Sequence, residues 1–161
     1  LRPYLETSGA SGLHLSVPLI PKYSYTQVGM FGEAIARHVA AQIPDAATTE
    51  RVVARRRGRV YIDYMQNRQG QTVVPPYVIR PVEAASVSTP LEWDELTSDI
   101  NVESFNLENI PERLLRTGDL FRGTLDDRQD LLSAIESFEE NYGVAATKKT
   151  SARRGSRRKK S

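Results

Sequence analysis

Alternating apolar and polar residues mark two short strands in the first half of the chain. In LHLSV, residues 13–17, the apolar residues share one face, and His14 and Ser16 share the other. In VYIDYM, residues 60–65, Asp63 interrupts an otherwise apolar pattern, and such a carboxylate is costly unless it is solvated, paired or bound to a metal. We predict that the two strands are central neighbours in one sheet, so that His14 and Asp63 face the same cleft.

Apolar residues at three- and four-residue spacing predict helices over residues 26–43, 106–116 and 125–142. Thr89 and Pro90 are residue types that favour the N-cap and the first helical position, so they predict a further helix start. Together with the strands, these helices predict an α/β fold, with a mostly antiparallel sheet on which the helices pack.

Composition narrows the class of protein. The chain has 161 residues, of which 39% are hydrophobic and 26% charged, and this balance fits one globular domain. The absence of cysteine excludes a disulfide framework and a thiolate metal site. No apolar run approaches the roughly 20 residues that span a membrane, so we expect no membrane partner.

The formal net charge of +2 is unevenly distributed. Residues 148–161 hold eight of the 22 Lys and Arg residues and no acid, which leaves 14 basic and 20 acidic residues in 1–147. Composition therefore predicts a disordered basic tail over residues 147–161. Such a tail can hold DNA nonspecifically, and a purely solubilising or linker role is the alternative.

A glycine-containing loop, ETSGASG, runs directly into the first of the two strands. Ser8, Gly9 and Gly12 are small and leave backbone donors free to approach an anion. The polar face that begins at His14 opens just after this loop. The pattern indicates an anion-binding loop, and a simple turn without a ligand is the alternative.

Five arginines lie close together in residues 51–59, with Arg55, Arg56 and Arg57 consecutive. Guanidinium groups in such a cluster can contact the phosphates of a nucleic acid. A solvated helix end or loop is the alternative explanation.

The stretches TSGASGLHL, GRVYIDYMQN, PPYVIRP, VSTPLEWDEL and GDLF resemble the polymerase domain of bacterial DNA ligase D, over roughly residues 3 to 135 and in the same order. That domain belongs to the archaeo-eukaryotic primase superfamily. The resemblance implies part of a primase-type catalytic core and a metal-dependent nucleotidyltransferase that extends DNA ends in non-homologous end joining. It also implies Mn²⁺ or Mg²⁺, ribonucleoside or deoxyribonucleoside triphosphates, the end-binding protein Ku, a DNA ligase module and the cytoplasm, at the bacterial nucleoid.

By the same resemblance, Asp63 is a catalytic carboxylate and the third metal ligand of the family. Ser8, His14 and Arg80 match residues that contact the phosphates of the incoming nucleotide, and the backbone of Gly9 and Gly12 adds donors.

Two departures qualify the resemblance. Many relatives carry lysine where this chain has Glu6, and the Asp-x-Asp pair that precedes the glycine loop in the family is not present. We therefore interpret residues 1–146 as the C-terminal part of the domain and expect no polymerase activity from this chain alone. The alternative function is that of a non-catalytic nucleic-acid-binding protein, in which the arginine cluster and the basic tail carry the activity.

Overall fold

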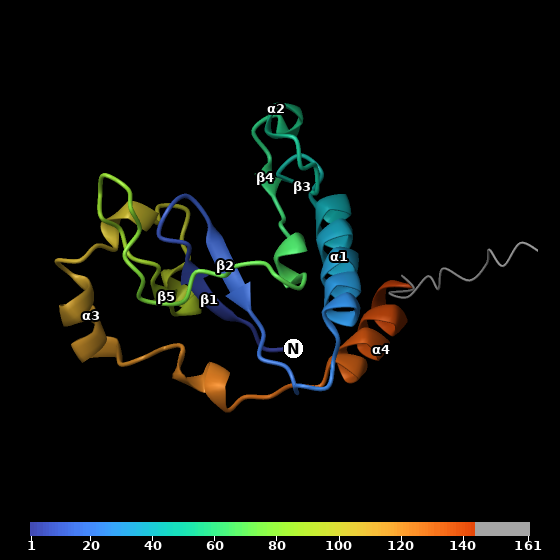
Figure 1. Ribbon diagram of the computed structural model, residues 1–161. Helices are drawn as coiled ribbons and strands as arrows, with labels where there is room; N and C mark the ends of the chain where they lie inside the picture. The colour runs from blue at the N-terminus through green and yellow to red at the C-terminus, as the bar shows by residue number, and fades with distance from the viewer. Residues whose placement is uncertain (144–161) are drawn as a thin grey trace, which may run out of the picture.

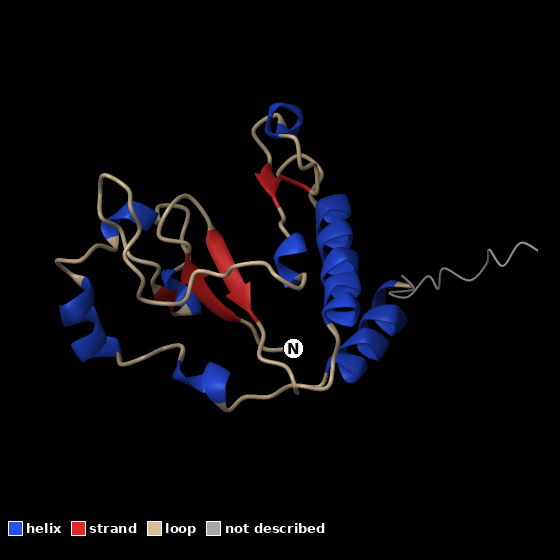
Figure 2. Cartoon of the chain, in the orientation of Figure 1, coloured by secondary structure: helices blue, strands red, loops and turns tan. Residues whose placement is uncertain are grey.

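The computed structural model describes residues 1–143 and has a mixed α/β architecture (Figures 1 and 2). The tail predicted at residues 147–161 lies outside the described residues, as do residues 144–146 of the predicted domain. The strands at residues 4–16 and 90–91 lie together with residues 92–117 in one group (Figure 1). The helices at residues 25–42 and 131–142 form the other group, together with a projecting arm made of residues 47–61.

A three-stranded antiparallel sheet carries the glycine loop. Its order is β2-β1-β5, with β1 spanning Tyr4–Thr7, β2 Leu13–Ser16 and β5 Pro90–Leu91. The β1–β2 register places Glu6 opposite His14 and Leu5 opposite Leu15. The predicted first strand and the antiparallel sheet are therefore confirmed.

The prediction that the 13–17 and 60–65 strands are neighbours is wrong. Strand β4, Val60–Tyr61, pairs in parallel with β3, Ala47–Thr48, in a separate two-stranded sheet. β3 follows closely after α1 and leaves its backbone groups free for β4, so Val60 donates to Ala46 and Ile62 to Thr48. The extended stretch then ends, because Met65–Asn67 forms a 3-10 turn.

Helix α1, Tyr25–Gln42, confirms the predicted 26–43 helix. It begins with a capping box, in which the Ser24 hydroxyl accepts from the Gln27 amide and the Gln27 side chain accepts from the Ser24 amide. It ends just before Pro44, a residue that cannot continue a helix.

Helix α4, Leu131–Tyr142, packs against α1. Buried Phe31 of α1 and Leu131 of α4 form the centre of this contact. Asp130 caps α4 by accepting from the Leu132 amide, and hydrogen bonds from the Tyr23 hydroxyl and the Lys22 ammonium hold the pKa of Asp130 down, at about 2. The helix is shorter than predicted because residues Arg122–Leu125 form a separate 3-10 turn.

The helix predicted to start at Thr89 is not formed. Pro90–Leu91 is the edge strand β5, and Thr89 is fully buried with its hydroxyl donating to the Val87 carbonyl. Because Thr89 is buried, its hydroxyl bonds to the backbone and does not cap a helix. Pro90 is tolerated because an edge strand can accept a residue without an amide donor. The acids that follow lie in a 3-10 turn, Trp93–Glu95, which Glu92 caps.

The remaining elements are short. Helix α2 spans Val53–Arg56, and helix α3 spans Ile110–Thr117, four residues later than the predicted start at residue 106. A further 3-10 turn spans Val102–Ser104. Within residues 1–143, each helix is too short or too polar to cross a lipid bilayer.

Candidate phosphate-binding site

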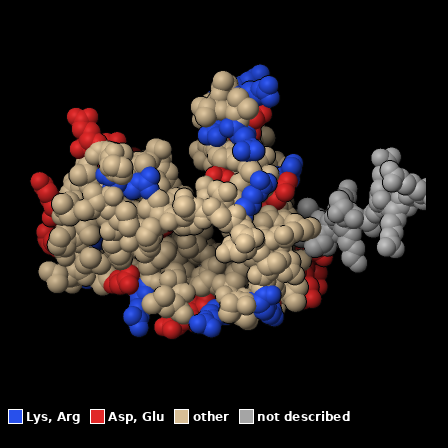
Figure 3. All heavy atoms as spheres, in the orientation of Figure 1, with Lys and Arg blue, Asp and Glu red and all other residues tan. Residues whose placement is uncertain are grey.

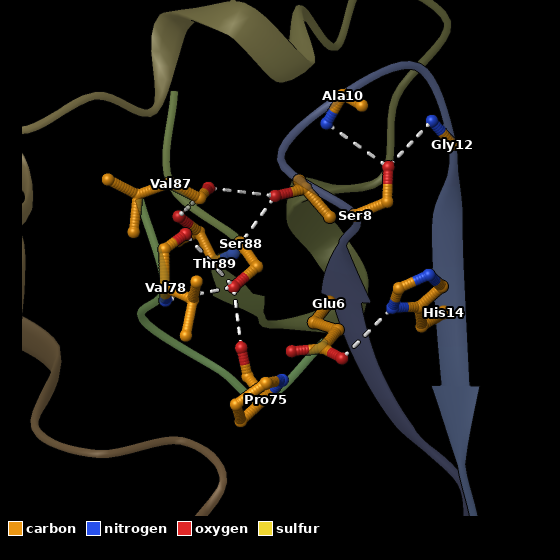
Figure 4. A network of polar contacts seen from close by, with 11 residues as sticks. Glu6, Ser8, Ala10, Gly12, His14, Pro75, Val78, Val87, Ser88 and Thr89 are labelled. Atoms are coloured by element: carbon orange, nitrogen blue, oxygen red, sulfur yellow. Dashed lines mark hydrogen bonds and ion pairs between the residues drawn. The ribbon is translucent and has the colours of Figure 1, made fainter. Parts of the chain in front are cut away.

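The loop between β1 and β2 is closed by its own serine. The Ser8 amide donates to the Gly12 carbonyl at 2.8 Å, and the Ser8 hydroxyl oxygen accepts from the amides of Ala10 at 3.2 Å and Gly12 at 3.0 Å (Figure 4). The amides of Ser8 and Gly12, which the sequence led us to expect would face a ligand, are therefore used inside the loop. The hydroxyl proton of Ser8 remains available to donate to an anion, because Ser8 acts as acceptor in both bonds.

Gly9 fixes the loop against its neighbours. Its φ is +65°, and a Cβ atom at this position would lie 2.6 Å from Arg80 Cγ and 2.7 Å from the Ser88 amide nitrogen. The Gly9 carbonyl accepts from the Ser86 hydroxyl at 2.6 Å. Only glycine allows this approach, and the contact brings the stem of Arg80 onto the loop.

Four completely buried hydroxyl side chains pack next to the loop: Thr7, Ser86, Ser88 and Thr89. Each is satisfied by a hydrogen bond to backbone, such as Thr7 to the Val87 carbonyl and Ser88 to the Pro75 carbonyl (Figure 4). Buried polar groups that are fully paired specify one arrangement of the chain. We did not predict this cluster from the sequence, although the run SVST before Pro90 was the available signal.

Arg80 lies on a segment that pairs with the same cluster. Its amide donates to the Ser86 carbonyl at 2.8 Å, and its Nε is buried without a hydrogen-bond partner among residues 1–143. Three residues earlier, Tyr77 has a φ of +65°, and its hydroxyl donates to Asp119 at 3.0 Å. Burial and this hydrogen bond raise the pKa of Tyr77 to about 12, so the phenol stays protonated and the tether is kept.

His14 faces Glu6 across the β1–β2 pair. His14 Nδ1 lies 3.2 Å from Glu6 Oε1, and the side chains are 35% and 2% exposed, respectively (Figure 4). The sequence presents Glu6 as a replacement for a lysine of relatives and does not predict its pairing with His14. Predicting that Glu6 and His14 pair would have required the register of the β1–β2 hairpin, and the sequence alone does not fix that register.

Asp63 lies elsewhere. It is exposed, its Oδ1 accepts from the Met65 amide at 2.9 Å, and it lines a groove of about 380 Å³ together with Leu15 and Val17. Leu15 and His14 are adjacent on β2 and point to opposite faces. The expectation that His14 and Asp63 share one cleft is therefore not met, because β4 belongs to a different sheet.

The described residues do not form a site that fits Mn²⁺ or Mg²⁺. Within residues 1–143, no three His, Cys, Asp or Glu residues are grouped so that they could hold a metal ion. A single carboxylate leaves such an ion mostly hydrated.

The arginine cluster forms the tip of a projecting arm at α2 (Figures 1 and 3). Its members divide into two kinds. Arg56 and Arg59 are half-buried and donate to backbone carbonyls of the arm, and Arg56 also lies over the Tyr61 ring at 4.2 Å. Arg51, Arg55 and Arg57 are exposed, and their guanidinium groups make no hydrogen bond or ion pair within the described part of the chain.

Comparison with known proteins defines the class. Residues 1–121 match the model of the family described as LigD, primase-polymerase domain. The chain is 32% identical over 137 residues to the bifunctional non-homologous end joining protein LigD of Bacillus subtilis, covering 82% of this chain and 22% of that protein. It is 35% identical over 114 residues to the multifunctional LigD of Pseudomonas aeruginosa, covering 71% of this chain and 14% of that protein.

Comparison of the fold with solved structures indicates the same family. The polymerase domain of Mycobacterium tuberculosis ligase D, solved in complex with DNA, matches with a TM-score of 0.71 and 28% sequence identity, over 77% of this chain and 43% of that one. The chain therefore belongs to the LigD primase-polymerase domain family, as its sequence motifs predicted. It spans less than a quarter of the length of the two curated relatives.

Proposed function

We propose that the protein is a nucleotidyltransferase of DNA end joining, and that this chain supplies its nucleotide-phosphate site. The observation that carries the proposal is the preformed loop at Ser8–Gly12, which packs on Arg80 and opens beside His14. A hydroxyl, a guanidinium and an imidazole are donors suited to phosphate oxygens.

Arg80 supplies the fixed positive charge in this proposal. A guanidinium stabilises negative charge that develops on a transferred phosphoryl group. The buried Nε has no partner among the described residues, and a bound phosphate would satisfy it. The stem of Arg80 is held against Gly9, so little side-chain freedom remains to be lost when a ligand binds.

DNA ends are the proposed macromolecular substrate. The solved neighbour contains DNA, and the exposed arginines 51, 55 and 57 present unpaired charge at the tip of the α2 arm. Partnership with Ku and a ligase module, and cytoplasmic localisation, are further parts of the proposal that rest on family membership.

Dependence on Mn²⁺ or Mg²⁺ is also a proposal that rests on family membership. Asp63 would contribute one carboxylate, and further carboxylates would have to come from outside residues 1–143. For the 161-residue chain alone we expect triphosphate binding without turnover, at about millimolar strength, or roughly −4 kcal/mol.

The test is primer extension by the full-length gene product, compared with its Asp63→Ala variant. We expect the substitution to abolish extension, and equal extension by both would remove Asp63 from the mechanism. In parallel, inorganic triphosphate is titrated into the 161-residue chain, where Arg80→Ala should weaken binding and Arg128→Ala, an exposed arginine elsewhere, should not. Binding that persists in Arg80→Ala contradicts the phosphate site, and DNA binding without extension supports the non-catalytic alternative.

A further inference from the structure

We propose that Glu6 is a positioning residue for His14. Its buried carboxylate accepts a hydrogen bond from Nδ1–H of the imidazole and leaves Nε2 to meet a phosphate of a bound nucleoside triphosphate. The part of this inference that concerns the ligand rests on the proposed function, whereas the part that concerns the imidazole ring does not.

The backbone sets the distance between the two side chains. Glu6 and His14 are register partners on adjacent antiparallel strands, and directly opposed residues project to the same face of a sheet. The Nδ1 to Oε1 distance is 3.2 Å. The His14 ring therefore has a partner fixed by the sheet and not by a mobile loop.

Burial makes this contact necessary for Glu6. The residue is 1% exposed, and its Oε2 has no hydrogen-bond partner in the described part of the chain. An isolated buried carboxylate is strongly unfavourable. His14 is the polar side chain that the structure places against it, so the imidazole provides the compensation.

For a neutral ring, two arrangements of the protons are compatible with the distance. In one, an ionised carboxylate accepts from Nδ1–H, and the neutral ring has a bare Nε2. In the other, a protonated Glu6 donates to Nδ1, and Nε2 carries the proton. The hydrogen bond at one ring nitrogen determines which nitrogen is protonated. We infer the first arrangement, because a hydrogen bond to an ionised acceptor is about twice as strong as a neutral one.

The orientation of the ring then gives the pair a role in binding. Nε2, the ring nitrogen that is not hydrogen-bonded to Glu6, lies on the side of the ring toward the Ser8–Gly12 loop (Figure 4). When the ring carries both protons, Nδ1 donates to Glu6 and Nε2 can donate to a phosphate oxygen. The imidazolium then lies between two anions, the carboxylate and the phosphate, and screens one from the other.

The experiment uses the two histidines of the chain, His14 and His38. With ¹⁵N-labelled histidine, long-range ¹H–¹⁵N NMR at about pH 8, above the ordinary histidine pKa of about 6.5, reports the tautomer of each ring. We expect the Nδ1–H tautomer at His14, its loss in Glu6→Leu, and its retention in Glu6→Gln, whose amide oxygen can still accept. The Nε2–H tautomer in the unsubstituted chain would overturn the inference.

His38 provides the check on folding, because its ring packs against Phe138 and Tyr142 of α4, and α4 lies apart from the β1–β2 pair (Figure 1). Unchanged His38 signals show that a Glu6 variant is folded. If Glu6→Leu proves unfolded, the Glu6→Gln variant and the unsubstituted chain still decide the tautomer.

Titration with inorganic triphosphate tests the consequence for binding. We expect Glu6→Leu and His14→Ala each to weaken binding about 10-fold, the scale of a hydrogen bond to a charged group, and the double variant to be no weaker than His14→Ala alone. A folded Glu6→Leu chain that binds as tightly as the unsubstituted chain overturns the positioning role. If His14→Ala also binds as tightly, the proposed function fails for His14, while the tautomer still decides whether Glu6 holds the ring.

Discussion

At the scale of single residues, close contacts decide which side chains the phosphate-binding loop tolerates. Gly9 and Gly12 stand in the same loop, yet only Gly9 has a positive φ and a crowded Cβ position. A Cβ atom added at Gly12 would have Ser8 Oγ as its nearest neighbour, at 3.8 Å, which is an ordinary contact. The two glycines therefore have different physical roles.

We predict that Gly9→Ala destabilises the protein by about 2 kcal/mol or more, because it combines a strained φ with a clash. It should also weaken triphosphate binding by displacing Arg80. Urea unfolding and triphosphate titration measure the two effects. Gly12→Ala is the matched control and should change both by little. Equal stability of the two variants would show that the loop adjusts freely.

Arg113 provides a second test at this scale. Its side chain is 9% exposed and forms two hydrogen bonds to the Glu95 carboxylate and one to the Pro90 carbonyl. Removing one partner of a buried pair leaves the other uncompensated. Since Glu95 is 31% exposed, water can partly replace the arginine, and we predict that Arg113→Ala costs about 2 kcal/mol. Arg116→Ala on the same helix is the control, with little expected change.

The same pair predicts a dependence of stability on acid. The hydrogen bonds from Arg113 lower the pKa of Glu95 below its ordinary value of 4.5. A lowered pKa in the folded state means that the pair stabilises the fold fully above about pH 4.5 and loses this contribution as the pH falls through the lowered pKa. Denaturant unfolding at a series of pH values should therefore show a smaller acid loss in Glu95→Gln. Identical pH profiles would exclude Glu95 as a source of acid sensitivity.

At the scale of elements, the α2 arm separates arginines that hold the structure from arginines that face solvent. Arg59 donates to the backbone carbonyls of Arg56 and Pro44, which ties the arm to the end of α1. Arg57 adopts a left-handed conformation at the C-terminal end of α2, and its side chain extends from the tip into solvent. Arginines of one cluster in the sequence thus have different surroundings.

We predict that Arg55→Ala and Arg57→Ala weaken duplex DNA binding and each reduce the slope of log K against log salt by about 0.9, the value for one phosphate contact. Neither should change the melting temperature. Arg59→Ala should instead lower stability. Fluorescence anisotropy over a salt series measures the slope, and deletion of residues 148–161 gives the slope without the tail. Unchanged slopes in both point variants would contradict a DNA contact at the arm.

At the scale of the whole molecule, one edge of the main sheet is open. The order β2-β1-β5 leaves β2 with a partner on one side only among the described residues. Leu13 and Leu15 on this strand are 41% and 61% exposed. An unpaired edge bearing exposed apolar side chains favours association with another chain.

We predict that Leu15→Glu reduces self-association of the 161-residue chain and leaves its stability within about 0.5 kcal/mol. Sedimentation velocity over a range of protein concentrations measures the association. Leu115→Glu is the control, since Leu115 is 89% exposed on α3 and away from the edge. Association that persists in Leu15→Glu would place the contact elsewhere.

The sequence by itself determined the features that depend on local pattern. The apolar spacing of α1 and the alternation of the strand at Leu13 follow from neighbouring residues, and the structure bears both out. The family was also readable, because short stretches such as TSGASGLHL carry it without reference to the rest of the fold.

The tertiary structure alone decided which of these pieces meet. Strand pairing joins residues that are far apart in the chain, and the alternation of side chains does not specify a partner. β4 therefore paired with β3, and Asp63 came to line a groove with Leu15, away from His14. Likewise, Thr89 has the residue type of a helix cap, but burial under the glycine loop directed its hydroxyl to the backbone, since a buried polar group must be paired.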